Sequence, residues 1–494
     1  MKSIIYKYTM TLAILSMLLI PNALSIEQDS FLNNKKSLIV TDIGNIISVD
    51  DDGSENYTKI QDAIDNASSG DTIIVFSGTY KETLTIDKQL YLMGIEENEE
   101  GIPIIDAEGY EYAVCINADS CLFQGFKVIN SSKNDFIFAC IKVMSDNNEL
   151  RNNTIMDSYN GIWLTNSNNN FLSNNNISKS NFGVFLLESS NNTIINNLIN
   201  TTRMNINSSN GGIYTWYHSN NNIIFNNTLE CDFNGDGIII SESLRNKISN
   251  NTISSYSTSD RNDTIFPIFQ YGFNGILLQL YSHNNEVINN NISGYFTASQ
   301  IWNSNENLFT QNYISNNLMG LYLYKSHKNI ITHNNFINNT FPLDIFDVMP
   351  FKFLQFFLKR LLSQHATFCS SFLNHWKGNY WDDWSSAFPK PIKGTIERST
   401  MSIFYGVIPI PSPPIIPLWN FDWHPLKEPY IHQKDKTNQV PETSSYLLLN
   451  RLKTTKIPDI KDYSPHIINI SDRHDISRIT LKLPPYINEH YYFE

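Results

Sequence analysis

The chain has 494 residues, 41% of them hydrophobic, which is enough apolar material for one large core or several domains. Its 35 basic and 48 acidic side chains give a formal net charge of −13 at pH 7. This balance excludes nucleic acid as an expected partner, because phosphate contacts require clustered Lys and Arg. Five cysteines are scattered without paired spacing, which predicts buried free thiols rather than a disulfide framework.

The first 25 residues have the pattern of a secretory signal peptide. Lys2 and Lys7 give a basic start, residues 11–20 form an apolar run, and Ala-Leu-Ser at 23–25 resembles a cleavage site. The run is short for a membrane span, so cleavage is favoured over an uncleaved anchor. Without this segment the charge is 33 − 48 = −15. We therefore expect an exported chain, extracellular or on the cell surface, with a leader over residues 26–46.

An amphipathic segment follows the leader, at residues 57–67. It places Tyr57, Ile60, Ile64 and Ala67 on one helical face, and turn and strand sequences come after it. We predict a short helix that covers the open N-terminal end of a repeat domain, where a core and a sheet edge would otherwise be exposed.

An Asn-x-apolar pattern then recurs along the chain. Successive occurrences are separated by 22, 22, 30, 24, 39, 22 and 22 residues. They begin at Asn153, Asn175, Asn197, Asn227, Asn251, Asn290, Asn312 and Asn334. A period of 22 residues with occasional insertions is typical of a solenoid.

A second pattern, a small residue followed by alternating aliphatic residues, keeps register with the asparagines. Its positions are Gly161, Gly183, Gly212, Gly237, Gly275, Ala298, Gly320 and Pro342. Each of the first seven lies 14 or 15 residues before the next asparagine, so all insertions enter one corner of the coil. The alternation indicates half-buried strands. We predict an all-β fold, a right-handed parallel β-helix over residues 47–347, with Asn and Gly at corners where φ is positive and with ladders of Asn side chains.

The C-terminal part has a different composition. Residues 350–363 have an amphipathic helical pattern that is too short to span a membrane, so peripheral contact with a membrane and packing against the domain are both kept as interpretations. Tryptophans concentrate between 376 and 423, which predicts an aromatic C-terminal cap within 348–430. Residues 431–494 form a polar tail.

Repeat and tail together resemble a known group. The stretch "YTKIQDAIDNASSGDTIIVFSGTYKETLTIDKQLYLMG", the coils anchored by asparagine, and the Gly-Asn-Tyr-Trp block at 378–381 resemble secreted prokaryotic NosD-type, pectin-lyase-like β-helix proteins. The resemblance covers about residues 49–347. It implies the same fold, and either carbohydrate binding, sugar hydrolysis or a periplasmic role in copper supply. Because this fold carries many functions, none of them transfers without matching residues.

Aromatic residues gather at outward positions of the expected strands, two and four residues after the coil glycines. They are Trp163, Phe185, Tyr214, Trp216, Trp302, Tyr322 and Tyr324. Sugar rings stack on such platforms, and an exposed apolar stripe usually has a partner. The alternative is that the aromatic tail packs over the stripe. We expect a secreted or cell-surface protein that binds polysaccharide or another glycan.

One local motif predicts a metal. Asp232, Asn234 and Asp236 match the start of a calcium loop that ends on Gly237. Ser243 stands where the loop requires Glu, and Gly237 is also the coil glycine, so calcium and an ordinary turn are both kept. No other cofactor is predicted. Copper is disfavoured because the aligned His283 and His327 lie two coils, about 10 Å, apart.

Whether the chain is an enzyme is left undecided. Glycoside hydrolysis needs two carboxylates that face one groove. The repeats lack the Gly-His-Gly and Arg-Ile-Lys blocks of the hydrolases that share the fold, and the Asp382-Asp383 pair lies beyond the predicted coils. Polysaccharide cleavage and NosD-like copper handling are therefore alternatives, beside a purely structural surface protein.

Overall fold

The structure is a computed structural model that describes residues 44–53, 55–96, 101–202, 210–232, 235–256, 272–339, 364–386, 388–396 and 416–430. The predicted signal peptide at 1–25, the helix at 350–363 and the tail at 431–494 lie outside these residues. Among the described helices, none is long and apolar enough to cross a membrane.

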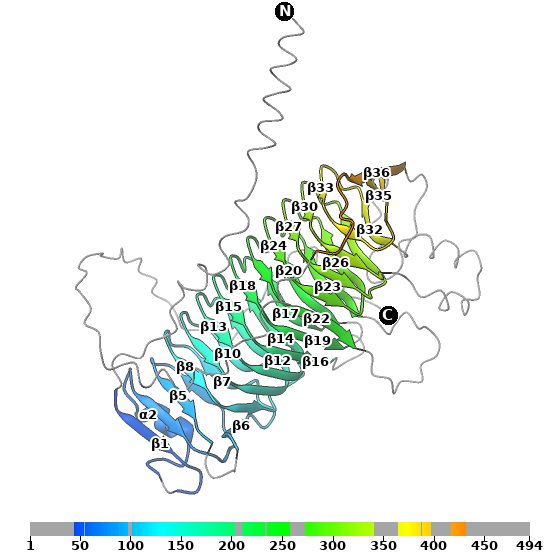
Figure 1. Ribbon diagram of the computed structural model, residues 1–494. Helices are drawn as coiled ribbons and strands as arrows, with labels where there is room; N and C mark the ends of the chain where they lie inside the picture. Colours follow the sequence, from blue (N-terminus) through cyan, green and yellow to red (C-terminus); the bar gives the residue numbers. More distant parts are fainter. Residues whose placement is uncertain are drawn as a thin grey trace, which may run out of the picture. The chain divides into compact units, whose positions relative to one another are not determined.

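The fold is a right-handed parallel β-helix, and each coil adds one strand to each of three faces (Figure 1). The first face is a 13-stranded sheet of β1 (Ile46–Val49), β2 (Thr72–Val75), β5 (Tyr91–Gly94), β8 (Leu122–Gln124), β11 (Glu149–Arg151), β13 (Phe171–Ser173), β15 (Thr193–Ile195), β18 (Ile223–Phe225), β21 (Lys247–Ser249), β24 (Glu286–Ile288), β27 (Leu308–Thr310), β30 (Ile330–Thr332) and β33 (His375–Lys377). The second face consists of β3 (Thr79–Tyr80), β6 (Ile104–Asp106), β9 (Lys127–Ile129), the first parts of β12 (Thr154–Thr165) and β14 (Asn176–Leu187), β16 (Leu198–Thr201), β19 (Thr228–Asp232), β22 (Thr252–Tyr256), β25 (Asn291–Ser293), β28 (Tyr313–Ser315), β31 (Asn335–Ile337) and β34 (Tyr380–Trp381). The third face consists of β4 (Leu84–Ile86), β7 (Tyr112–Ile116), β10 (Ala139–Val143), the second parts of β12 and β14, β17 (Gly211–Trp216), β20 (Asp236–Ser241), β23 (Gly272–Gln279), β26 (Tyr295–Trp302), β29 (Met319–Tyr324), β32 (Gln364–Cys369), β35 (Lys390–Ile396) and the antiparallel β36 (Ile416–Asp422).

Stacked aliphatic side chains fill the interior. One inward column, fully buried, consists of Ile155, Ile177, Ile199, Leu229, Ile253, Ile292 and Ile314. At the N-terminal end the predicted helix is confirmed as α2 (Ile60–Asn66), whose Ile60, Ala63 and Ile64 are fully buried against the first coils. The five cysteines are free, and four of them are buried.

The predicted asparagine ladders are present. In the main ladder the side-chain Oδ1 of each member after the first accepts a hydrogen bond of 2.9–3.2 Å from the backbone N–H of the preceding member. Its members are Asn153, Asn175, Asn197, Asn227, Asn251, Asn290, Asn312, Asn334 and Asn379. The residue just before a ladder member carries the positive φ, as at Asn152 and Asn174. At these corners the first asparagine therefore turns the chain, and the second forms the hydrogen bonds between coils.

The coil glycines serve a different purpose from the predicted one. Gly161 and Gly183 do not have positive φ. A Cβ on Gly161 would lie 2.7 Å from the carbonyl oxygen of Gly183 and would collide with the side chain of Ile177. The close approach of stacked coils, rather than backbone conformation, requires glycine here.

The solenoid continues beyond its predicted end at residue 347. β32, β33 and β34 stack in parallel on β29, β30 and β31, so the last coil reaches Trp381. The register pairs Met319 with Gln364 and Leu321 with Ala366, which places His365 in the glycine position of this coil. The prediction that Pro342 occupies that position was wrong, because residues 340–363 precede the last coil as an insertion.

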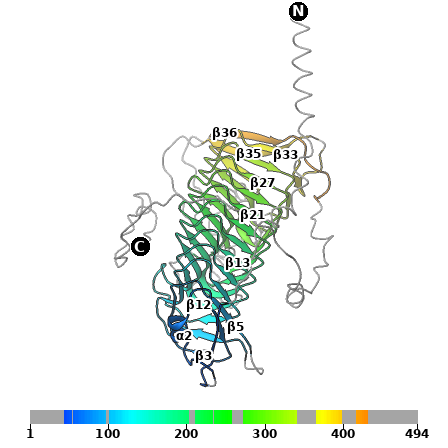
Figure 2. The ribbon, with the colours of Figure 1, turned by 90° about the vertical axis from the view of Figure 1, so that its left-hand side faces the viewer.

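The β35–β36 hairpin closes the C-terminal end (Figure 2). Its fully buried Asp422 takes the place of the next ladder asparagine. The carboxylate accepts hydrogen bonds from the backbone N–H groups of Gly378 and Asn379 at 2.9 Å each, and from Asn379 Nδ2 and Trp381 Nε1 at 3.0 Å each. The ladder thus ends on a group that only accepts, which leaves none of these donors unpaired.

Candidate functional site

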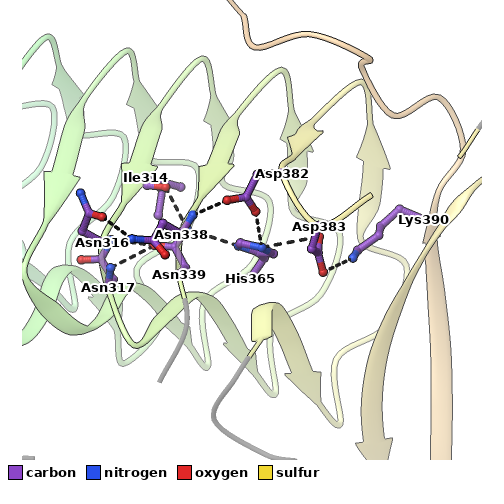
Figure 3. A network of polar contacts seen from close by, with 9 residues as sticks. All are labelled: Ile314, Asn316, Asn317, Asn338, Asn339, His365, Asp382, Asp383 and Lys390. Carbon is purple, nitrogen blue, oxygen red and sulfur yellow. Dashed lines mark hydrogen bonds and ion pairs between the residues drawn. The ribbon is translucent and has the colours of Figure 1, made fainter. Parts of the chain in front are cut away.

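A polar network lies on the last coil (Figure 3). β32 supplies His365, and Asp382 and Asp383 follow β34 directly. His365 Nε2 lies 2.8 Å from Asp382 Oδ1 and 3.5 Å from Asp383 Oδ1, and the imidazole is buried. In the part of the chain that the structure describes, this is the one group of three His, Cys, Asp or Glu side chains close enough to share a metal ion.

The end of an asparagine ladder determines the tautomer of His365. Asn339 donates from Nδ2 to the carbonyl of Ile314 at 2.8 Å and accepts at Oδ1 from Asn317. Its Nδ2 therefore also faces His365 Nδ1, at 3.4 Å. Because an amide nitrogen only donates, Nδ1 has to accept and the ring proton lies on Nε2, where it is donated to Asp382.

This arrangement does not fit a metal ion. A metal on Nε2 would move the ring proton to Nδ1, directly against the amide nitrogen of Asn339. The carboxylates are already engaged, since Asp382 Oδ2 accepts from the backbone N–H of Asn338 at 2.6 Å and Asp383 Oδ2 contacts Lys390 Nζ at 2.6 Å. The contacts instead link β32 to the residues that follow β34 and so stabilise the last coil. We call His365, Asp382, Asp383 and Lys390 the clamp.

The clamp predicts an acid-sensitive contribution to stability. Burial raises the pKa of Asp382, but the hydrogen bonds from His365 and Asn338 outweigh it, so the net shift is below 3.8. A lowered folded-state pKa adds stability that is complete above 3.8 and is lost as the pH falls through the folded-state value. We expect Asp382→Asn to flatten the acid limb of a plot of urea midpoint against pH, between about pH 5 and 2. An acid limb as steep in the variant as in the parent would contradict the assignment.

The strand pairing divides the predicted aromatic stripe into two groups. The first aromatic group is Trp163, Phe185, Tyr214 and Trp216, on β12, β14 and β17. The second aromatic group is Trp302, Tyr322 and Tyr324, on β26 and β29. Between them the outward positions hold Ile239, Leu277, Ser241, Gln279 and Gln300. The stripe is therefore interrupted over two coils.

Much of this surface is covered. Trp163 is 5% exposed, Phe185 4% and Tyr324 7%, whereas the other four rings are half-buried. These three rings are therefore buried in the structure, and glycan binding by the stripe stays a prediction. Trp163 and Phe185 still form a cluster of their own, separate from the interior core.

Each group combines rings, an indole donor and a lysine. In the first group Tyr214 and Trp216 stack with ring centroids 6.2 Å apart, and Lys142 Nζ lies 4.7 Å from the Trp163 ring centroid. In the second group Lys325 Nζ lies 5.0 Å from the Tyr324 ring centroid. Three indole N–H groups in the described residues are buried without a hydrogen-bond partner: those of Trp163 and Trp302 in these groups, and that of Trp376 in the interior core. Buried donors are normally paired, so all three are exceptions that call for an acceptor.

The predicted calcium residues are not brought together by the described contacts. Asn234 lies outside the described residues. Asp236 Oδ1 accepts from the backbone N–H and the Nδ2 of Asn274, at 2.8 and 2.9 Å, and burial raises its pKa to about 6. Asp232 is buried, and its carbonyl closes a turn onto Gly235. Calcium at this loop stays a prediction.

The aligned histidines bind turns. Asn305 donates its backbone N–H to His283 Nδ1 at 2.8 Å, and Phe372 donates to His327 Nδ1 at 3.1 Å. Burial lowers the pKa of His283, which keeps the imidazole in the neutral form that accepts. Both imidazole rings therefore accept hydrogen bonds that stabilise corners of the coil.

His365 was not among the residues predicted from the sequence to form a site. A signal for it exists, because His365 lies 14 residues before Asn379, the same interval that separates coil glycine and ladder asparagine elsewhere. The insertion before it hid this register.

The chain was compared with known proteins. A family model described as "Periplasmic copper-binding protein (NosD)" matches residues 64–265 and 230–386. No curated protein matches. Among solved structures, a pectin methylesterase from carrot is 13% identical with a TM-score of 0.37, over 51% of this chain and 85% of that chain. DFA-IIIase from Arthrobacter chlorophenolicus A6, without its lid, is 13% identical with a TM-score of 0.46, over 68% and 94%. A periplasmic alginate epimerase is 14% identical with a TM-score of 0.37, over 65% and 84%.

All three TM-scores lie below 0.5, and the architecture is established by the strand pairing described above. The family match is broader, because its two segments together run from residue 64 to residue 386 of 494. It covers coils, ladders and the closing network alike. The chain therefore belongs to the NosD family of β-helix proteins.

Proposed function

We propose that this protein is exported and binds polysaccharide along its outer aromatic groups. The observation that carries the proposal is that two indole donors of these groups, Trp163 Nε1 and Trp302 Nε1, have no hydrogen-bond partner. An unsatisfied buried donor costs about 1–3 kcal/mol, so a ligand oxygen that reaches it gains that amount. Because both donors are buried, binding includes an opening of the surface around them.

The layout of the two groups suits a chain-like ligand. Trp216 and Trp302 occupy the same outward column three coils apart, which corresponds to about 14 Å along the solenoid. Each group offers ring faces on which sugars stack. Two weak contacts joined by one polymer reinforce each other through effective concentration.

The lysines specify the kind of sugar. Lys142 and Lys325 stand beside the rings of Trp163 and Tyr324, where an ammonium group can meet a carboxylate of the ligand. The chain as a whole is acidic, with a net charge of −13, so the overall charge does not account for lysines at both aromatic groups. We infer that polymers containing uronic acids bind more tightly than neutral ones, and that added salt weakens the difference.

The test is affinity electrophoresis of the chain without residues 1–25 on neutral and uronate polymers. We expect retardation on uronate gels that falls by about tenfold in a Trp163→Phe/Trp302→Phe variant, which removes both donors but keeps the rings. The matched control is Trp384→Phe, because Trp384 Nε1 already donates to the carbonyl of Phe388 at 2.9 Å. Equal retardation of the parent and the double variant would contradict the role of the donors.

Reducing-end assays on the same samples test polysaccharide cleavage, the enzymatic alternative. The family description names copper, but the one His/Asp/Asp group in the described residues is a closed clamp that does not fit a metal ion. No described observation therefore favours copper over the glycan in this chain.

A further inference from the structure

The outer surface of the C-terminal hairpin is apolar where a solenoid end is normally polar. Because Asp422 points into the ladder, its neighbours on β36 point outward. These outward residues are aromatic: Trp419 is 51% exposed, Phe421 37% and Trp423 63%. Terminal repeats usually present a polar outer face for solubility, so closing the ladder does not explain this choice.

The neighbouring strand adds one positive charge to the same surface. Antiparallel register sets Lys393 opposite Trp419 and Pro391 opposite Phe421, and directly opposed residues share a face. Lys393 Nζ lies 5.9 Å from the Trp419 ring centroid, and the Phe421 and Trp423 centroids are 5.6 Å apart. We call Pro391, Lys393, Trp419, Phe421 and Trp423 the end face. Its one charged side chain is the lysine.

The chain between the two strands of the hairpin has a matching composition. From Ser399 to Phe421 the sequence carries no charged residue, and it includes Ile403, Phe404 and Ile408. β35 and β36 are paired up to Ile396 and Ile416, so residues 397–415 connect the two strands of the hairpin. Apart from Glu397 and Arg398 at its start, the connection carries no charge, and in an acidic protein such a composition favours an apolar partner over a polar one.

We propose that the end face contacts a lipid surface that contains anionic headgroups. Trp and Phe flanked by Lys are the side chains that prefer the boundary between headgroups and acyl chains. A nearby lysine adds attraction to anionic lipid. A sugar would also require acceptors for its hydroxyl groups, and none of the five end-face side chains can accept a hydrogen bond. This proposal is independent of the glycan site, which uses other residues.

The experiment is flotation with vesicles of phosphatidylcholine and phosphatidylglycerol, using the chain without residues 1–25. Those residues lie outside the described fold, and their removal takes away an unrelated apolar segment. We expect the parent to float and Trp419→Ser/Phe421→Ser/Trp423→Ser to lose binding by at least about tenfold. Trp423→Ser alone should lose part of it, which keeps the test valid if the triple variant folds poorly. The matched control is Trp163→Phe/Trp302→Phe, which should float like the parent.

Several outcomes would overturn the proposal. Absence of flotation by the parent is one, and undiminished flotation of the triple variant is another. Loss of flotation in Lys352→Glu/Lys359→Glu but not in the triple variant would place the contact in the segment 350–363. Concentration-dependent self-association that the triple variant abolishes, without vesicle binding, would identify a second copy as the partner. Retardation on polysaccharide gels that the triple variant abolishes would identify a glycan instead.

Discussion

Replacing Asn312 by Asp is expected to lower the free energy of unfolding by about 3–5 kcal/mol. Asn312 is fully buried, and its Nδ2 donates at 2.9 Å to both the carbonyl of Val287 and Asn334 Oδ1. A carboxylate retains the acceptor for Asn290 but turns both donations into contacts between oxygen atoms. It also buries a negative charge between two coils, which costs free energy unless the charge is paired.

Urea unfolding followed by far-UV circular dichroism measures this change. The matched control is Asn176→Asp, an exposed asparagine on β14, which should shift the midpoint little. Equal shifts of the urea midpoint in the two variants would show that the ladder position contributes no more to stability than an exposed position.

Replacing Asp422 by Ala is expected to lower the free energy of unfolding by a similar amount, about 3–5 kcal/mol, because it removes an acceptor rather than a donor. The substitution leaves four N–H donors around Gly378, Asn379 and Trp381 without an acceptor. These donors lie at the open end of the stack, so the last coil should fray before the rest of the solenoid unfolds.

Hydrogen exchange resolves where this loss occurs. We expect faster exchange over β33 and β34 in Asp422→Ala, and little change over β13 and β15. Asp422→Asn keeps one acceptor oxygen and should be intermediate. Uniformly faster exchange along the solenoid would contradict the assignment of Asp422 as an end closure.

Most of the fold could be predicted because each coil repeats the same physical requirement. Ladder asparagines such as Asn175 and Asn197 recur at the coil period, since every coil needs a donor and an acceptor at the same corner. The last coil was missed because residues 340–363 interrupt that period. The role of the glycines was also misassigned, since the contact of Gly161 with the next coil depends on a spacing that one strand does not reveal.

The candidate site was less predictable for a related reason. Periodicity places Trp163 and Phe185 outside the core, and the structure confirms this. How far they are exposed depends on neighbouring side chains and other segments, which no single repeat encodes. The tautomer of His365 depends on which way the amide of Asn339 points, and that orientation is fixed by Ile314 and Asn317. Such a chain of contacts exists only after folding.

The central claim is that the two aromatic groups bind an acidic polysaccharide. The most direct test is a calorimetric titration of the polymer that gives the strongest retardation into the parent and into Trp163→Phe/Trp302→Phe. We expect saturable binding by the parent and an affinity about tenfold lower in the variant, with both proteins folded at the temperature of the titration. Identical affinities, or no heat on any polymer in the panel, would contradict it and leave the aromatic groups as packing surface.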